Sequence, residues 1–290
     1  MKQIQLIAMD LDGTLFTDDK QISEKNRKAI LEAQHNGIRM VICTGRLRED
    51  VAYYLKRYKL CMDRICCNGA VVATGDIHTE TILETHQFKA EEARDLIALL
   101  LQYPLMINAF TNGYTITHAS DDAQKYHLVE RGIIREKRGI PALLEGAERG
   151  IYKFYITWDR TCNYGMELLK YTREEVHHAF PGCEISQSDS TTLEIMPNAV
   201  NKGNTLLSFA KKIGIDQSGI MAIGDEENDL PMLKMASFSV AMGNAADSVK
   251  KLCRFITASN ENAGVAEAIY YAMNRENTCM CLKKNVEERL

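Results

Sequence analysis

Apolar residues along this chain come in short runs that alternate with longer amphipathic segments. In the first part, the runs 4–9, 38–43 and 64–67 have the length and apolar character of buried strands. The segment after the first run repeats apolar residues at helical spacing, starts at Ser23, a good N-cap residue, and stops at Gly37. This alternation predicts a parallel sheet flanked by helices.

This alternation of strand and helix patterns stops at about residue 83 and resumes at about residue 190. The middle stretch has a helix–strand–strand–helix order, which is typical of an α+β domain with an antiparallel sheet. We therefore expect an α/β protein with a doubly wound, mostly parallel, Rossmann-like core sheet and an inserted α+β cap domain. The predicted boundaries are 1–82 and 191–275 for the discontinuous core, 83–190 for the cap and 276–290 for a C-terminal tail.

Composition and charge narrow the classes of partner. The chain has 290 residues, 46% of them hydrophobic and 26% charged, which suits a globular protein of two domains. A net charge of -4 gives no electrostatic reason to expect nucleic-acid or anionic-membrane binding. The first residues lack the pattern of a signal peptide or membrane span, so we expect a cytoplasmic protein, a monomer or weak homo-oligomer. Its nine cysteines are then expected to be free thiols.

Each unusual polar stretch in the predicted core directly follows a predicted strand. Because ligands of doubly wound sheets bind at the carboxyl ends of the strands, these stretches should converge on one rim. Lys202 opens the helix just after the insert and can reach the same rim from the side. The stretches are "DLDGT" (10–14), "TGR" (44–46), "CNGA" (67–70) and "GDEEND" (224–229).

The first stretch suggests a metal site. Asp10 and Asp12 lie two positions apart on an extended backbone, so their carboxylates lean to the same side. Their like charges would raise one pKa sharply, and a divalent cation relieves this repulsion. Asp225, with Asp229 nearby, adds carboxylate from across the rim. We expect these four aspartates to form a Mg²⁺ site, because hard oxygen ligands favour that ion.

With the metal held, one aspartate is free to attack phosphorus, and the other can move protons. Phosphoryl transfer also needs cationic and hydrogen-bonding groups, which Lys202, the Thr44 hydroxyl and the Gly45 backbone N–H can supply. Arg46 has two interpretations, as a group that steers an anionic substrate or as the partner of a carboxylate at the domain junction. For Asn68 we favour hydrogen bonding at the mouth of the site over a role in a turn.

In this order, the stretches resemble the haloacid dehalogenase superfamily of phosphohydrolases. Its pattern is D-x-D-G-T after the first strand, Thr or Ser after the second, Lys before a helix, and G-D-x-x-N-D after a later strand. The "TGR", the "NGA" and the long insert look like the Cof-type subgroup, whose cap supplies substrate selectivity. The resemblance spans about residues 4 to 270.

The resemblance implies a role for each matching residue. Asp10 would be the nucleophile and Asp12 the general acid and base, with the metal held by the Asp10 carboxylate, the Asp12 backbone carbonyl and Asp225. The implied substrates are small phosphorylated metabolites, most plausibly sugar phosphates. The implied contacts of the phosphoryl group are Thr44, Gly45, Lys202 and Asn228.

The chain departs from the family pattern just before the lysine. Many relatives have a glycine and then a serine or aspartate there, whereas this chain has Ala199 and Asn201, which puts the local turn in doubt. Glu226 and Glu227 also add carboxylates beside the metal site, and they would weaken phosphate binding unless they point outward.

Other functions stay open at this stage. A phosphomutase would return the phosphate to the sugar, and a phosphometabolite-binding regulatory protein would retain the site without turnover. A dehalogenase needs neither Mg²⁺ nor an acid at Asp12, and a transport ATPase needs membrane spans that the sequence lacks. A cap that admits substrate and excludes water needs hinges, which we expect near Leu83 and in 190–194.

Overall fold

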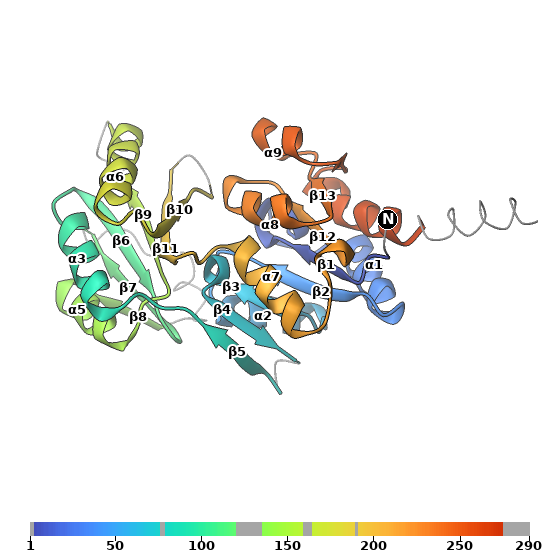
Figure 1. Ribbon diagram of the computed structural model, residues 1–290, viewed down its shortest axis with the longest axis horizontal. Coiled ribbons are helices and arrows are strands. Elements are labelled where there is room, and N and C mark those ends of the chain that lie inside the picture. Colours follow the sequence, from blue (N-terminus) through green and yellow to red (C-terminus); the bar gives the residue numbers. More distant parts are fainter. Residues whose placement is uncertain (1–2, 76–78, 120–134, 159–163, 189–190, 275–290) are drawn as a thin grey trace, which may run out of the picture.

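The structure, a computed structural model, describes residues 3–75, 79–119, 135–158, 164–188 and 191–274. These residues form two sheets, each with its own hydrophobic cluster, and Figure 1 shows the two units side by side. The predicted α/β class, a mostly parallel core sheet with an inserted α+β cap, is confirmed. The described part of the chain has no helix with both the length and the apolar character that a membrane crossing requires.

The core sheet has eight strands in the order β14-β13-β12-β1-β2-β3-β4-β5. Its central strand β1 pairs in parallel with β12 and β2, and the antiparallel pairs are β3–β4 and β4–β5 at one edge, where β4 runs against its neighbours. Every residue of β1 and β12 is buried, as expected for parallel strands covered on both faces. The strands are β1 (Leu6–Met9), β2 (Arg39–Cys43), β3 (Asp63–Cys66), β4 (Val71–Thr74), β5 (Thr81–Thr85), β12 (Ile220–Gly224), β13 (Phe238–Ala241) and β14 (Phe255–Ile256).

The core helices begin and end where local sequence signals predict. The Ser23 hydroxyl accepts a hydrogen bond of 3.1 Å from the backbone N–H of Asn26, which caps the first helix, and Ala29, Ile30 and Ala33 form its buried face. The helices are α1 (Glu24–His35), α2 (Arg48–Tyr58), α7 (Lys202–Lys212), α8 (Leu230–Met235), α9 (Asp247–Leu252) and a further helix over 264–274.

The cap sheet has six strands in the order β10-β11-β9-β6-β7-β8, antiparallel except for the β7–β8 pair. Figure 1 shows the cap helices on the side of this sheet that faces away from the core, so the other face of the sheet is turned toward the core. The strands are β6 (Leu105–Phe110), β7 (Tyr114–His118), β8 (Arg135–Arg138), β9 (Lys153–Trp158), β10 (Cys183–Ser186) and β11 (Leu193–Asn198), and the helices are α3 (Ala90–Leu100), α5 (Ile140–Arg149) and α6 (Gly165–Ala179).

Two strands extend beyond the boundaries predicted from the sequence. Strand β5 belongs to the core sheet and runs to Thr85, and strand β11, from Leu193 to Asn198, belongs to the cap sheet although the predicted core resumes at 191. The reason is that strand pairing is a long-range property, whereas the predicted boundaries follow local changes of pattern. The predicted tail, 276–290, lies outside the described residues.

The turn that leads from β11 into α7 forms without a glycine. Ala199 adopts a left-handed conformation with φ of 58°, and the Asn201 side chain accepts a hydrogen bond of 2.8 Å from the backbone N–H of Asn204, which caps α7. The departure noted in the sequence therefore leaves the turn intact, with an alanine in a conformation that favours glycine.

Ala199→Gly is expected to raise the free energy of unfolding by about 1 kcal/mol, because it relieves a left-handed alanine that is exposed and buries little surface. The measurement is the midpoint of a urea unfolding curve. Ala98→Gly is the matched control, since Ala98 lies on the exposed side of α3 and should lose about 1 kcal/mol. A decrease in stability for both variants would show that the left-handed conformation of Ala199 is not strained.

Candidate active site

The predicted polar stretches meet at the carboxyl ends of the core strands. Residues 11–15 form a tight turn directly after β1, in which Gly13 has φ of 71°. Thr44 follows β2 and Asp225 follows β12, and both strands pair directly with β1. Asp10 therefore lies between the loops that carry Thr44 and Asp225, as the doubly wound topology predicts.

Three buried carboxylates and one buried lysine form the centre of this site. Asp10, Asp225 and Asp229 each offer an oxygen, and these oxygens lie within 4.8 Å of one another. The Lys202 ammonium donates to Asp10 Oδ1 at 2.7 Å and to Asp229 Oδ1 at 2.6 Å. One lysine leaves two of the three carboxylate charges unbalanced within this group. An all-oxygen donor set with this excess charge fits a divalent cation.

The pKa values in this group reflect the same imbalance. Burial, opposed by Lys202 and reinforced by the charges of Asp229 and Asp12, raises the pKa of Asp10 to about 7. Burial and the charges of Asp229 and Asp10 raise the pKa of Asp225 to about 8, although the Thr14 hydroxyl donates a hydrogen bond of 2.6 Å to its carboxylate. Burial alone would lower the pKa of Lys202, but Asp10 and Asp229 raise it above its usual value.

Asp229 takes part in this group mainly through hydrogen bonds within the protein. Its Oδ2 accepts the backbone N–H groups of Asp225 at 2.9 Å and Glu226 at 3.2 Å, while its Oδ1 accepts Lys202. Asp229 thus holds the Asp225 loop in shape and orients the lysine. The sequence pattern predicts it as a metal ligand, and the structure brings it to the cluster with both oxygens already engaged.

The Asp12 side chain points away from the cluster and toward two cations. Arg46 Nε donates to Asp12 Oδ2 at 2.5 Å, Arg46 Nη2 donates to Oδ1 at 2.7 Å, and Lys20 Nζ lies 2.7 Å from Oδ1. Burial would raise the pKa of Asp12, but Arg46 and Lys20 hold it well below its usual range. Of the two interpretations of Arg46, the structure shows the one in which it pairs with a carboxylate. Buried Asp50 is a second carboxylate partner of Arg46.

The predicted phosphoryl contacts lie around this centre. The Thr44 hydroxyl accepts the backbone N–H of Arg46 at 3.2 Å. The Asn228 amide donates to Asn68 Oδ1 at 3.4 Å, so the "NGA" and "GDEEND" loops touch. Asn68 also has a left-handed backbone with φ of 54°, and it therefore combines a site position with the turn role that we ranked second. The structure brings all ten predicted site residues to this rim.

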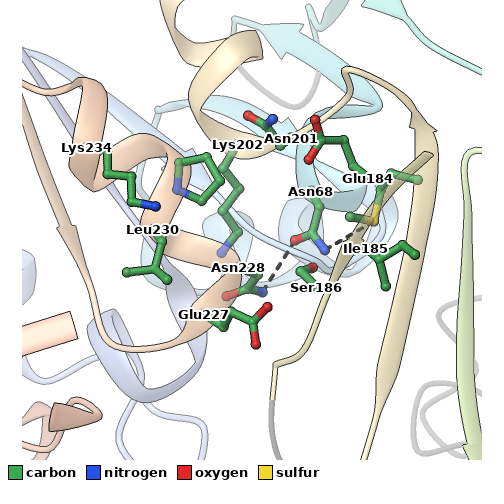
Figure 2. A pocket seen from close by; sticks show the side chains of 12 residues that line it. Asn68, Glu184, Ile185, Ser186, Asn201, Lys202, Glu227, Asn228, Leu230 and Lys234 are labelled. Atoms are coloured by element: carbon green, nitrogen blue, oxygen red, sulfur yellow. Dashed lines mark hydrogen bonds between the residues drawn. The ribbon is translucent and has the colours of Figure 1, made fainter. Parts of the chain in front are cut away.

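A pocket opens beside these groups, between the cap and the core. It encloses about 530 Å³, including space open to solvent. Figure 2 shows the Lys202 ammonium and the Asn68 and Asn228 amides close together near the centre, with Ser186 of cap strand β10 beside the two amides and Leu230 and Lys234 on the left. A substrate whose phosphate lies near Lys202 would place its remaining atoms in this pocket.

Several residues at this junction carry no local sequence signal. Arg173 of cap helix α6 pairs with Glu227 of the core at 2.6 Å, so this carboxylate is bonded to a cation of the cap. Lys20 is likewise recognisable only once the chain is folded. Lys153 and Glu194 of the cap sheet form a buried pair 2.5 Å apart, next to Gly45 and Asn68. The partners of Arg173, Lys153 and Glu194 lie far away in sequence, so no spacing rule points to these three residues.

The fold and the site define a capped α/β enzyme whose chemistry depends on carboxylates. A sequence model of the haloacid dehalogenase-like hydrolase family matches residues 7–269. A 5-amino-6-(5-phospho-D-ribitylamino)uracil phosphatase of Bacillus subtilis is 32% identical, with 91% of this chain and 96% of the relative covered. A pyridoxal phosphate phosphatase of Escherichia coli is 28% identical, with 92% and 97% covered.

Solved structures agree with these sequence relatives. A haloacid dehalogenase-like hydrolase from Bacteroides thetaiotaomicron superposes with a TM-score of 0.76 at 26% identity, covering 93% of this chain and 99% of the other. A haloacid dehalogenase-like hydrolase from Bacillus subtilis has a TM-score of 0.81 at 24% identity, covering 92% and 99%, and supports the fold. The chain belongs to the haloacid dehalogenase-like hydrolase family, and within it the chain is a phosphoric monoester hydrolase.

Gly13→Ala is expected to reduce kcat/KM for p-nitrophenyl phosphate by about a hundredfold or more, because a Cβ there would collide with the Asp225 carboxylate. Gly37→Ala is the matched control. Gly37 has φ of 80°, against 71° for Gly13, but a Cβ at Gly37 meets nothing within 4 Å. Both variants should lose about 1 kcal/mol of stability from the left-handed backbone. Equal kcat/KM in the two variants would show that the contact with Asp225 is unimportant.

Proposed function

We propose that this phosphatase hydrolyses small phosphorylated metabolites, with sugar phosphates as the main substrate class, through an aspartyl-phosphate on Asp10. The observation that carries the proposal is the Lys202 ammonium, which is buried between Asp10 and Asp229 at the edge of the pocket. A buried cation at this place supports both an ionised nucleophile and the charged oxygens of a phosphoryl group.

Each residue of the site has a task in this chemistry. The ionised Asp10 attacks phosphorus and expels the alcohol, and Lys202, Thr44 and Asn228 bind the phosphoryl oxygens. When protonated, Asp12 gives its proton to the leaving oxygen, and the carboxylate that results then takes a proton from the water that cleaves the aspartyl-phosphate. Arg46 and Lys20 favour its ionised form, which is the form that the second step needs.

A divalent ion fits the carboxylate group, and we propose Mg²⁺. The Asp10 carboxylate, the Asp12 backbone carbonyl and the Asp225 carboxylate would hold it. When bound, it would offset the negative charge shared by the carboxylates and the phosphate. The support is the donor set itself, which consists of oxygens and carries an excess of negative charge.

The pocket lining favours a polyhydroxylated leaving group. Around it are amides, carboxylates and lysines, which can donate to and accept from hydroxyl groups, and among the described residues none of its lining side chains is aromatic. The apolar part of the lining consists of Ile185, Met196, Leu230 and Pro231. A flat heteroaromatic group would lack a ring to stack on. The ribityl chain in the name of the Bacillus subtilis relative's substrate is a polyol of the kind that such a lining suits.

Composition alone supports the remaining part of the proposal. A net charge of -4 gives no basis for nucleic-acid binding, and we propose a cytoplasmic enzyme that is a monomer or a weak homo-oligomer.

Asp10→Asn is expected to lower the release of phosphate from p-nitrophenyl phosphate by about a thousandfold or more, because the amide is a poor nucleophile. Asp19→Asn, at an exposed loop position, is the control and should retain full activity. Wild-type release should require Mg²⁺ and stop with EDTA. Undiminished release from Asp10→Asn would rule out the aspartyl-phosphate, and EDTA-resistant release would rule out the metal.

Sugar and alditol phosphates are expected to show kcat/KM values at least about tenfold above those of pyridoxal phosphate and nucleoside monophosphates, because the pocket offers hydrogen bonds but no stacking partner. Free phosphate and isomerised sugar phosphate are measured together across one panel. Equal rates for flat and polyhydroxylated substrates would contradict the proposed class. Isomerised product without free phosphate would indicate a mutase.

A further inference from the structure

Lys153 and Glu194 form an ion pair on the face of the cap sheet that is turned toward the core. Their side chains are 1% and 3% exposed, and Lys153 Nζ lies 2.5 Å from Glu194 Oε1. The neighbouring residues Phe154 and Ile195 point the other way, into the hydrophobic cluster of the cap. The pair therefore presents two buried charges to the core at the place where its phosphate-site loops lie.

Lys153 reaches the loop that carries Thr44. Its ammonium donates to the backbone carbonyl of Gly45 at 2.8 Å, and the N–H at the other end of the same peptide group, that of Arg46, donates to the Thr44 hydroxyl oxygen at 3.2 Å. A cation at the carbonyl end polarises the peptide group and strengthens its N–H as a donor. With its oxygen accepting this bond, the Thr44 hydroxyl is oriented to donate its own hydrogen elsewhere.

Glu194 reaches the loop that carries Asn228. Its Oε2 accepts the Asn68 amide at 2.6 Å, and Asn68 Oδ1 accepts the Asn228 amide at 3.4 Å. The contact also fixes which end of the Asn68 amide is the donor, so that its oxygen is turned to Asn228. Asn68 has a left-handed backbone, and a buried charge-assisted hydrogen bond is a strong restraint on such a residue.

The contacts to the Thr44 loop and to the Asn228 loop both start from the Lys153–Glu194 pair. A single hydrogen-bonded chain runs from Thr44, through Gly45, Lys153, Glu194 and Asn68, to Asn228. Its middle belongs to the cap, and its ends are two of the predicted phosphoryl contacts on separate core loops. A pair whose only task is stability could be replaced by apolar residues at little cost, since burying charges is itself unfavourable.

We infer that Lys153 and Glu194 are positioning residues, through which the cap sheet sets the Thr44 and Asn228 loops for phosphoryl binding. The inference rests on the proposed function in one respect, namely that these loops contact the phosphoryl group. Displacing the cap sheet would remove the pair from both loops together, so cap placement and phosphate affinity are coupled, and by linkage each favours the other.

The test is the double variant Lys153→Met/Glu194→Gln, which removes both charges, leaves no unpaired buried ion and keeps the volumes similar. The matched control is Arg39→Met/Asp63→Asn. Arg39 Nη2 donates to Asp63 Oδ1 at 3.0 Å at the starts of β2 and β3, whereas Thr44 and Asn68 lie just beyond the far ends of the same strands. Calorimetric titration with inorganic phosphate in Mg²⁺ gives Kd, p-nitrophenyl phosphate gives kcat and KM, and thermal melting gives stability.

The double variant is expected to bind phosphate about tenfold or more weakly and to lose about a hundredfold in kcat/KM. The control should keep both values within about threefold, and its loss of thermal stability should be smaller because the Arg39 side chain is 47% exposed. Each single variant should weaken phosphate binding about as much as the double variant, because the contacts to both loops depend on one ion pair.

Three results would overturn the inference. A phosphate Kd of the double variant within about threefold of the wild-type value would show that the pair acts on stability alone. Additive effects of the single variants would show two independent contacts instead of one shared pair. If the wild-type protein itself failed to bind phosphate, the proposed function would fail as well, which separates that outcome from the first two.

Discussion

The repulsion among buried carboxylates at the end of β1 is the constraint on which the site depends. Asp10, Asp225 and Asp229 lie close together where their charges cannot be relieved by water, and Lys202 is the cation that bonds to two of them. The fold imposes this arrangement because β1 and β12 are neighbours in parallel register, so their carboxyl ends bring the two aspartate loops together. A divalent cation at the proposed site would relieve this repulsion.

Around this centre the structure separates two electrostatic environments. Burial and the neighbouring carboxylates raise the pKa of Asp10 although Lys202 opposes the rise, whereas Asp12, two residues later, faces an arginine and a lysine that keep its pKa low. The chain leaves the extended conformation after Asp10 and enters the turn at 11–15, so Asp10 stays in the carboxylate group while Asp12 bonds to Arg46 and Lys20. Two chemically identical groups therefore acquire different acid–base properties from their surroundings.

Much of this could be predicted from the sequence because the signals are local. The strand at 4–9, the helix capped by Ser23 and the four polar stretches each depend on spacing within about ten residues, and the topology of parallel sheets then joins them. What the sequence did not reveal depends on pairs that are distant along the chain. Lys153 and Gly45 are 108 residues apart, and Asn68 and Glu194 are 126 apart. Strand β11 pairs with both β10 and β9 of the cap, and its assignment to the core followed a local change of pattern instead of this pairing.

The connection between the two sheets is very short on one side. Strand β11 of the cap sheet ends at Asn198 and helix α7 begins at Lys202, so only three residues join the cap to the lysine of the active site. The linker consists of a left-handed alanine, a buried valine and an asparagine that caps the helix. A cap domain exchanged between relatives would therefore bring its own linker geometry to Lys202. An exchange that keeps Lys202 in place has to retain residues 199–201 with the core. This requirement limits which caps can be exchanged among these enzymes.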